Sequence, residues 1–291
     1  MDYLKFKQIL NKHIFKEERI ELLRKIADYP ERFIGLFRPS KPGTKILQNL
    51  LQSHEIRFGK ALEEVIEEIL KELGYEILDK NLTTADNQQL HIDQFFMDKH
   101  GNIYFIEQKI RDDHDSSKKR GQIENFTKKL EEIYKRYKNN NISAIMYFID
   151  PDFKKNKNFY EEKLKKLSDV YKYKVKTYLF YGEELFKFLN AEQCWKNLLD
   201  WLKQWKEELP EIPEIDFDKE PKESFYEIRE LELRYWKKLL QNDKLWEEGI
   251  MQAIFRNGET LKLLYNYFNN DESKKELAKM IGKILNKYYN K

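Results

Sequence analysis

The sequence predicts an α/β protein: a mixed β-sheet core flanked by helices, with N-terminal helices before it and an all-α region after it. Between residues 75 and 190, short runs rich in β-branched and aromatic residues alternate with segments whose apolar residues recur at helical spacing. Beyond residue 190 no strand pattern recurs, and all five Trp residues lie there. The 291 residues are enough for two domains, or for one large domain with an appendage.

The N-terminal part reads as helices separated by prolines. Apolar stripes at helical spacing run through residues 4–14 and 20–27, and three prolines then interrupt the chain between residues 30 and 42. A long helix is expected from about residue 54 to residue 73, with Gly74 at its C-cap.

The middle of the chain predicts strands and helices in alternation. Strands are expected over residues 75–78, 90–97, 103–110, 142–149 and 175–182, and helices over 121–138, 157–170 and 183–189. Their interleaving favours a mixed sheet with helices on its faces.

These patterns divide the chain into three parts. We expect an N-terminal helical arm over residues 1–50, a core over 51–190, and a helical C-terminal region over 191–291 that serves for dimerisation or as a clamp on DNA. Three of the seven prolines lie among acidic residues in a linker at about 207–223.

Composition excludes several classes of function. The ten glycines are never closer than eight residues, so neither G-x-G-x-x-G nor a P-loop can be written. A single cysteine permits neither an internal disulfide nor a zinc ribbon. No apolar run approaches a membrane span, and the N-terminus lacks a signal-peptide core. We therefore expect a soluble, cytoplasmic protein without a membrane partner.

Positive charge is concentrated in the predicted core. Residues 99–180 hold 20 Lys/Arg and 12 Asp/Glu, a net charge of +8, whereas the whole chain has a formal charge of only +3. This distribution suits a polyanionic partner, and a Lys-rich helix surface in contact with water would also produce it.

The most specific feature is a predicted β-hairpin over residues 90–110. A turn signal at residues 98–102 places Asp93 opposite Glu107, and Lys109 lies two residues further on the same face. Two opposed acids repel each other, which is tolerable if a divalent cation lies between them. Alternatively, Asp93 is an edge-strand charge that blocks aggregation, and Lys109 is a solvated strand end.

The preceding helix adds a further carboxylate. Glu63 lies at the edge of the apolar stripe of that helix, one turn after Gly59, which leaves space for a metal or a phosphate. Taken alone, Glu63 would more commonly be a boundary carboxylate paired with a lysine.

The order of these motifs resembles the PD-(D/E)xK nuclease superfamily. A helix with Gly59 and Glu63, a strand with Asp93, and a strand with Glu107-x-Lys109 are followed by a helix and another strand. The continuation is similar to type II restriction endonucleases, most of all to HindIII-like enzymes. There are two departures: Ile92 replaces the proline of the motif, and Glu107 stands where HindIII-like enzymes have Asp. The resemblance implies a restriction-endonuclease-like fold.

The resemblance also implies a chemistry. Mg²⁺ would be held by Asp93, Glu107 and the carbonyl of Gln108, and would lower the pKa of a bound water. Lys109 would orient or deprotonate that water and stabilise the phosphorane. Glu63 would hold a second metal directly or through water.

The polar segment after the hairpin is the candidate DNA-binding region. Phosphates would be neutralised by four basic residues, Arg111, Lys118, Lys119 and Arg120. Gly121 is expected to precede a helix whose N-terminus meets DNA. Base edges would be contacted by polar residues, of which we select Asp115, Ser117 and Gln122. For any one of these residues, a place in a flexible loop that merely closes the turn is an equal alternative.

Two functions from different classes follow. The first is a Mg²⁺-dependent, sequence-specific endonuclease acting on double-stranded DNA. We expect it to be a homodimer because a palindromic target matches a two-fold protein. A repair or junction nuclease with the same chemistry is an alternative. The second is a non-catalytic DNA-binding protein with a degenerate nuclease core. The complete set of Asp93, Glu107 and Lys109 favours the enzyme.

Overall fold

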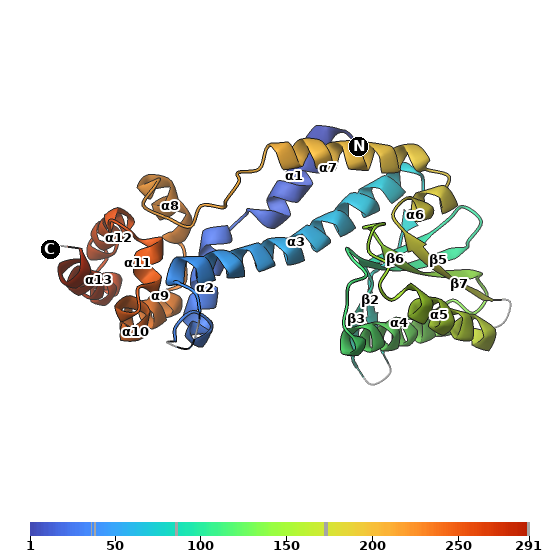
Figure 1. The fold of residues 1–291 in the computed structure, drawn as a ribbon, viewed down its shortest axis with the longest axis horizontal. Coiled ribbons are helices and arrows are strands. Elements are labelled where there is room, and N and C mark those ends of the chain that lie inside the picture. Colours follow the sequence, from blue (N-terminus) through green and yellow to red (C-terminus); the bar gives the residue numbers. More distant parts are fainter. Residues whose placement is uncertain (36, 38, 85–86, 172–173, 290–291) are drawn as a thin grey trace. The chain divides into compact units, whose positions relative to one another are not determined.

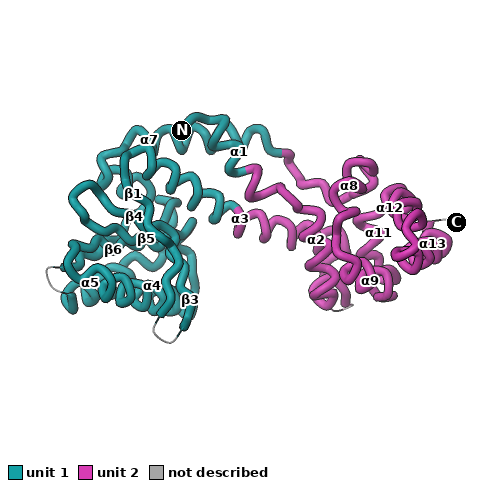
Figure 2. Tube along the Cα trace, turned by 180° about the vertical axis from the view of Figure 1, so that it is seen from behind, with its two compact units in different colours: residues 1–10, 58–209 teal, residues 11–57, 210–291 magenta. Residues whose placement is uncertain are grey.

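The computed structural model describes residues 1–35, 37, 39–84, 87–171 and 174–289, and it divides into two compact units (Figures 1 and 2). Unit 1 contains residues 1–10 and 58–209, and unit 2 contains residues 11–57 and 210–291. Each unit is therefore built from two separate stretches of chain. Within the described residues, no helix is both long and apolar enough to cross a membrane.

Unit 1 is built on a mixed five-stranded sheet. Its strands lie in the order β1 (Glu76–Ile77), β4 (Gln94–Met97), β5 (Ile103–Lys109), β6 (Ile142–Phe148) and β7 (Val175–Tyr181). The first three pair antiparallel and the last three pair parallel. A separate two-stranded sheet pairs β2 (Asn81–Thr83) with β3 (Gln89–His91). The predicted mixed sheet is confirmed.

Helices α4 (Ser116–Arg136) and α5 (Lys157–Tyr171) cover one face of this sheet (Figure 1). Alternate residues of β5 point into the core between them, and the rings of Phe105 and Phe126 stack with centroids 4.8 Å apart. On the opposite face, the ring of Phe96 stacks on that of Tyr104 at 4.9 Å. The alternation of side chains along a strand thus gives the sheet two apolar faces.

Three more helices belong wholly or mainly to unit 1: α1 (Tyr3–Ile14), α6 (Glu183–Phe188) and α7 (Glu192–Glu207). The ring centroids of Phe6 in α1 and Trp201 in α7 are 5.6 Å apart, and the Tyr3 hydroxyl donates to Glu208 at 2.6 Å. The start of α1 therefore packs within the same unit as the sheet, although it precedes the sheet by about seventy residues in the chain.

Helix α3 (Pro42–Glu72) is longer than the sequence suggested. The expectation that it begins near residue 54 is wrong: Pro42 is its first residue rather than the last of a series of breakers. Proline is tolerated in the first turn of a helix because the N–H groups there have no partner within the helix. The end is as predicted, since Gly74 has φ +85° and its N–H donates to the carbonyl of Lys71 at 3.0 Å.

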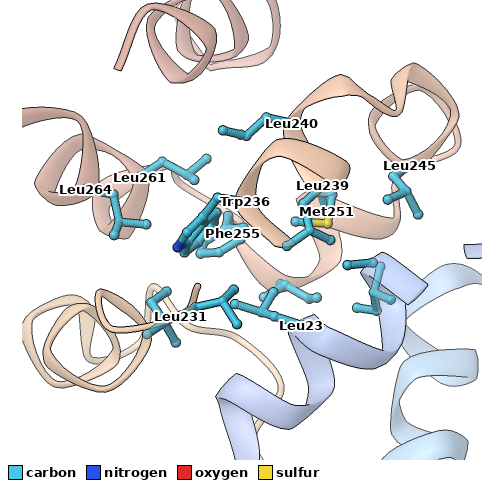
Figure 3. Close-up of a cluster of buried hydrophobic side chains, with 14 of the residues drawn as sticks. Leu23, Leu231, Trp236, Leu239, Leu240, Leu245, Met251, Phe255, Leu261 and Leu264 are labelled. Atoms are coloured by element: carbon cyan, nitrogen blue, oxygen red, sulfur yellow. The ribbon is translucent and has the colours of Figure 1, made fainter. Parts of the chain in front are cut away.

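Unit 2 is all helical in its described residues. Besides the first half of α3 it contains α2 (Glu18–Asp28), η1 (Pro30–Arg32), α8 (Pro221–Ile228), α9 (Leu233–Gln241), α10 (Asp243–Glu247), α11 (Ile250–Ile254), α12 (Glu259–Asn269), η2 (Glu272–Lys274) and α13 (Lys275–Tyr288). The predicted all-α C-terminal region is confirmed. Leu23 of α2 lies in the same apolar cluster as Trp236, Met251 and Phe255 (Figure 3), so α2 completes the core of the C-terminal helices.

Candidate active site

The hairpin of β4 and β5 has the register that the sequence predicts. Gln94 pairs with Ile106 and Met97 with Ile103, which places Asp93, just before β4, beside Glu107. The turn is held by the Asp98 carboxylate, which accepts from the backbone N–H of His100 and of Asn102. Gly101 has φ +78°, a conformation that glycine adopts without strain. The turn fixes the register, and the register brings the two acids together.

The Lys109 ammonium lies at the centre of the site. Its Nζ is 2.7 Å from Glu107 Oε1, 2.8 Å from the carbonyl oxygen of Gln108 and 3.2 Å from Asp93 Oδ2. Those are the three groups expected from the sequence to hold Mg²⁺. They converge on a single positive charge, and all three are hard oxygen donors of the kind that Mg²⁺ takes in proteins.

Both acids are buried and hydrogen-bonded. Asp93 is 8% exposed and Glu107 3% exposed, and Asp93 Oδ2 also accepts from the Gln108 N–H at 2.7 Å. Burial by itself would lower the pKa of Lys109, but the charges of Glu107 and then Asp93 outweigh burial and raise it. Lys109 is therefore a charged ammonium at neutral pH while the two carboxylates face it.

Glu63 of α3 belongs to the electrostatic surroundings of this cluster. The side chain of Gln94 donates to the backbone carbonyl of Glu63 at 2.7 Å, which ties α3 to the hairpin. Burial, and then the charge of Asp93, raise the pKa of Glu63 to about 7, against the smaller opposing effects of Lys109 and Lys80. In the described part of the chain, no group of three or more His, Cys, Asp and Glu side chains is placed to hold a metal. Glu63 thus influences the pair of acids without forming a three-carboxylate cluster with them.

Lys129 is a residue of the site that the sequence patterns do not predict. This residue of α4 is 4% exposed, and its Nζ lies 2.6 Å from Glu107 Oε2. A signal was present, because Lys129 is three residues after Phe126 and four before Ile133, and so lies on the apolar stripe of the helix. A lysine on such a stripe needs a buried acid as its partner.

A family comparison bears on this site. The model of the family described as "Type II restriction endonuclease, HinfI" matches residues 3–85 and 75–206. The chain belongs to this family. No curated protein matches the chain. The family match covers the whole sheet of unit 1 and every residue of the candidate site, and it ends before α8.

In this HinfI-family chain, more of the segment after the hairpin is helical than the sequence predicts. Helix α4 begins at Ser116, so the expectation that Gly121 precedes the helix is wrong, and Gly121 lies within it. Asp115 is the N-cap residue, and its side chain accepts from the N–H groups of Ser117 and Lys118, each at 2.9 Å. The sequence Asp-Ser-Ser contains this capping signal, but the apolar periodicity of the helix begins about two turns later, at Ile123.

The other candidate DNA-binding residues of this HinfI-family chain lie around the start of α4. Ser117, Lys118 and Arg120 are exposed. Lys119 Nζ lies 4.7 Å from the centroid of the Phe159 ring, and Arg111 Nε is 3.3 Å from Asp150. Gln122 Oε1 accepts from the Tyr160 hydroxyl at 2.5 Å. These side chains lie on or near one helix end, but several already have partners within the protein.

Asp112, which also lies in this segment, is a structural residue. It is fully buried and accepts from the N–H and Nδ2 of Asn156, both at 2.8 Å, and from the Tyr181 hydroxyl at 3.0 Å. These bonds join the end of β5 to the start of α5 and to β7. Asp112 is therefore not available to accept from a base edge.

Proposed function

We propose that this HinfI-family restriction endonuclease hydrolyses phosphodiester bonds of double-stranded DNA at a specific sequence, by the Mg²⁺-dependent chemistry of the PD-(D/E)xK superfamily. The observation that carries the proposal is the convergence of Asp93, Glu107 and the Gln108 carbonyl on the Lys109 ammonium, within 3.2 Å. A resident positive charge at this point indicates that the oxygens can hold a cation. The resemblance to HindIII-like enzymes supports the proposal only because those enzymes share this superfamily chemistry.

The roles of the side chains follow from their positions. Asp93, Glu107 and the carbonyl of Gln108 would hold Mg²⁺, which when bound would supply a Lewis acid and a water of lowered pKa. The charged Lys109 would orient the attacking water and stabilise the charge of the phosphorane. As an ammonium it has no lone pair with which to deprotonate that water. Glu63, whose pKa is raised to about 7, would hold a second metal directly or through water.

The same proposal assigns the DNA contacts. Arg111, Lys118, Lys119 and Arg120 would neutralise phosphates beside the scissile bond. Ser117 at the exposed start of α4 would reach a base edge, while Asp115 and Gln122 would do so with lone pairs that the helix cap and Tyr160 leave available. A homodimer would match a palindromic target, and the helical C-terminal region would serve as its dimerisation unit or as a DNA clamp.

Cleavage of phage DNA tests the proposal. We expect discrete fragments with Mg²⁺ or Mn²⁺, little cleavage with Ca²⁺ and none in excess EDTA, because Ca²⁺ takes more ligands at longer range. Asp93→Asn, Glu107→Gln and Lys109→Met, which preserve the shape of the side chains, should each abolish cleavage while circular dichroism stays unchanged. Glu124→Gln, on the exposed side of α4, is the control. Undiminished cleavage in EDTA would refute the metal mechanism, and a smear in place of fragments would refute sequence specificity.

A further inference from the structure

Lys129 is a buried lysine whose only described ion-pair partner is a proposed metal ligand. It projects from the core face of α4, among Ile123, Phe126 and Ile133, and its side chain is 5% exposed. An ammonium in such a place is costly unless a charge faces it at close range. Glu107 Oε2, at 2.6 Å, provides that charge.

Glu107 is consequently held between two ammonium groups that differ in exposure. Lys109 contacts Oε1 and is 28% exposed, whereas Lys129 contacts Oε2 and is 5% exposed. A cation arriving from solvent therefore meets the Oε1 side, which Asp93 and the Gln108 carbonyl also face. Lys129 lies on the opposite, buried side of the Glu107 carboxylate.

We propose that Lys129 is a positioning residue. It fixes the orientation of the Glu107 carboxylate through Oε2, so that Oε1 faces the catalytic cation. Its permanent positive charge also lowers the affinity of the site for that cation. This inference rests on the proposed function. With Lys129 present, the charges of Asp93, Glu107, Lys109 and Lys129 sum to zero. Without Lys129 the sum is −1, and Lys109 is the one described ion-pair partner left to hold the side chain of Glu107.

Lys129→Met should therefore raise the affinity for a divalent cation and lower the rate of cleavage. Removing a positive charge close to the ligand oxygens should tighten the binding of a divalent cation. Losing the fixed orientation of Glu107 should slow cleavage, because partners that orient a metal ligand are typically worth about 10- to 100-fold in metal affinity or activity. A role in structure alone predicts that both affinity and rate fall together.

Calorimetric titration with Ca²⁺ alone, on the full-length protein, measures the first effect, and single-turnover cleavage with Mg²⁺ measures the second. We expect Lys129→Met to bind Ca²⁺ at least roughly 3-fold more tightly and to cleave about 10- to 100-fold more slowly, with an unchanged affinity for DNA. Lys128→Met, an exposed neighbour on the same helix, should change neither quantity. In a Glu107→Gln background, Lys129→Met should no longer tighten Ca²⁺ binding.

The possible outcomes separate this inference from the function on which it rests. Ca²⁺ binding that is unchanged or weaker in Lys129→Met, while the wild type binds Ca²⁺ and cleaves, overturns the role of Lys129 alone. Cleavage by the Glu107→Gln variant at the wild-type rate overturns the metal site and the inference together. If Lys129→Met does not fold, Lys129→Gln, which keeps a donor for Glu107 without the charge, must show the same tightening.

Discussion

The Glu63 carboxyl is the group of the candidate site through which pH should act on stability. Its pKa is raised from 4.5 to about 7, first by burial and then by the Asp93 carboxylate. The folded protein therefore holds this proton more tightly than the unfolded chain does. The resulting contribution to stability is fully present below the unfolded pKa, 4.5, and is lost as pH rises through about 7.

Glu63→Gln should consequently stabilise the protein at alkaline pH relative to the wild type. After allowance for the partial exposure of the side chain, the difference in unfolding free energy between variant and wild type should move by about 1 to 2 kcal/mol in favour of the variant between pH 5 and pH 8.5. Urea denaturation in EDTA at both pH values measures this. Glu124→Gln is the exposed control. If the difference in unfolding free energy between Glu63→Gln and the wild type were equal at both pH values, the pKa of Glu63 would not be raised by burial.

At the scale of the element, the start of α4 couples the candidate DNA-binding segment to the sheet. Asp115→Ala removes a side-chain cap from two backbone N–H groups and should cost about 1 kcal/mol of stability, or roughly 2 to 4 °C in Tm. Asp115→Asn keeps an acceptor and should recover most of that loss. Thermal unfolding compares the two variants, and equal losses would mean that the charge, not the cap, stabilises the helix end.

The exposed residues of the same helix end should divide into two kinds in DNA binding. Lys118→Ala should weaken binding to cognate and mismatched duplexes alike and reduce the slope of log K against log salt by about 0.9. Ser117→Ala should relax discrimination at one base pair, by about 1 to 3 kcal/mol. Binding to both duplexes at two salt concentrations separates the two effects. A uniform loss for Ser117→Ala would assign base readout to another element.

How far the sequence predicts an element depends on where its signal lies. The sequence predicts the hairpin in register because its turn, Asp98 to Asn102, is local, and a local turn determines all the pairs that follow. The starts of α3 and α4 are not predicted correctly by the sequence, because Pro42 and Asp115 are helix-start residues that also occur in loops. Lys129 was missed because a lysine on an apolar stripe gains its meaning only from Glu107, 22 residues away.

At the scale of the whole molecule, the division of the chain followed from contacts that no local pattern reveals. The sequence suggested consecutive parts with boundaries near residues 50 and 190, whereas the compact units of the structure share the N-terminal half between them. Arg19 pairs with Glu227 at 2.8 Å, across 208 residues. Pairs so distant along the chain leave no periodicity or composition shift for a sequence analysis to detect.

A truncation tests this interleaving. A chain ending at Leu209 retains α2 but loses the residues against which Leu22, Leu23 and Ile26 pack. It should aggregate, because an apolar helix face without its partner is exposed to water. Size-exclusion chromatography with light scattering distinguishes aggregates from a monomer. A soluble, compact monomer with full cleavage activity would mean that residues 11–57 are stable without the C-terminal helices.

The same interleaving sets an order of events on the ribosome. Residues 58–209 form a continuous stretch that contains the whole sheet and the candidate site, so nearly all of unit 1 can fold as it emerges. Residues 11–57 must wait for residues 210–291, and at a synthesis rate of about 5–20 residues per second these take roughly 4 to 16 s after residue 209 has been added. During that interval the nascent chain carries a nuclease core close to completion and an N-terminal helix with an uncovered apolar face, which is the kind of surface that chaperones bind.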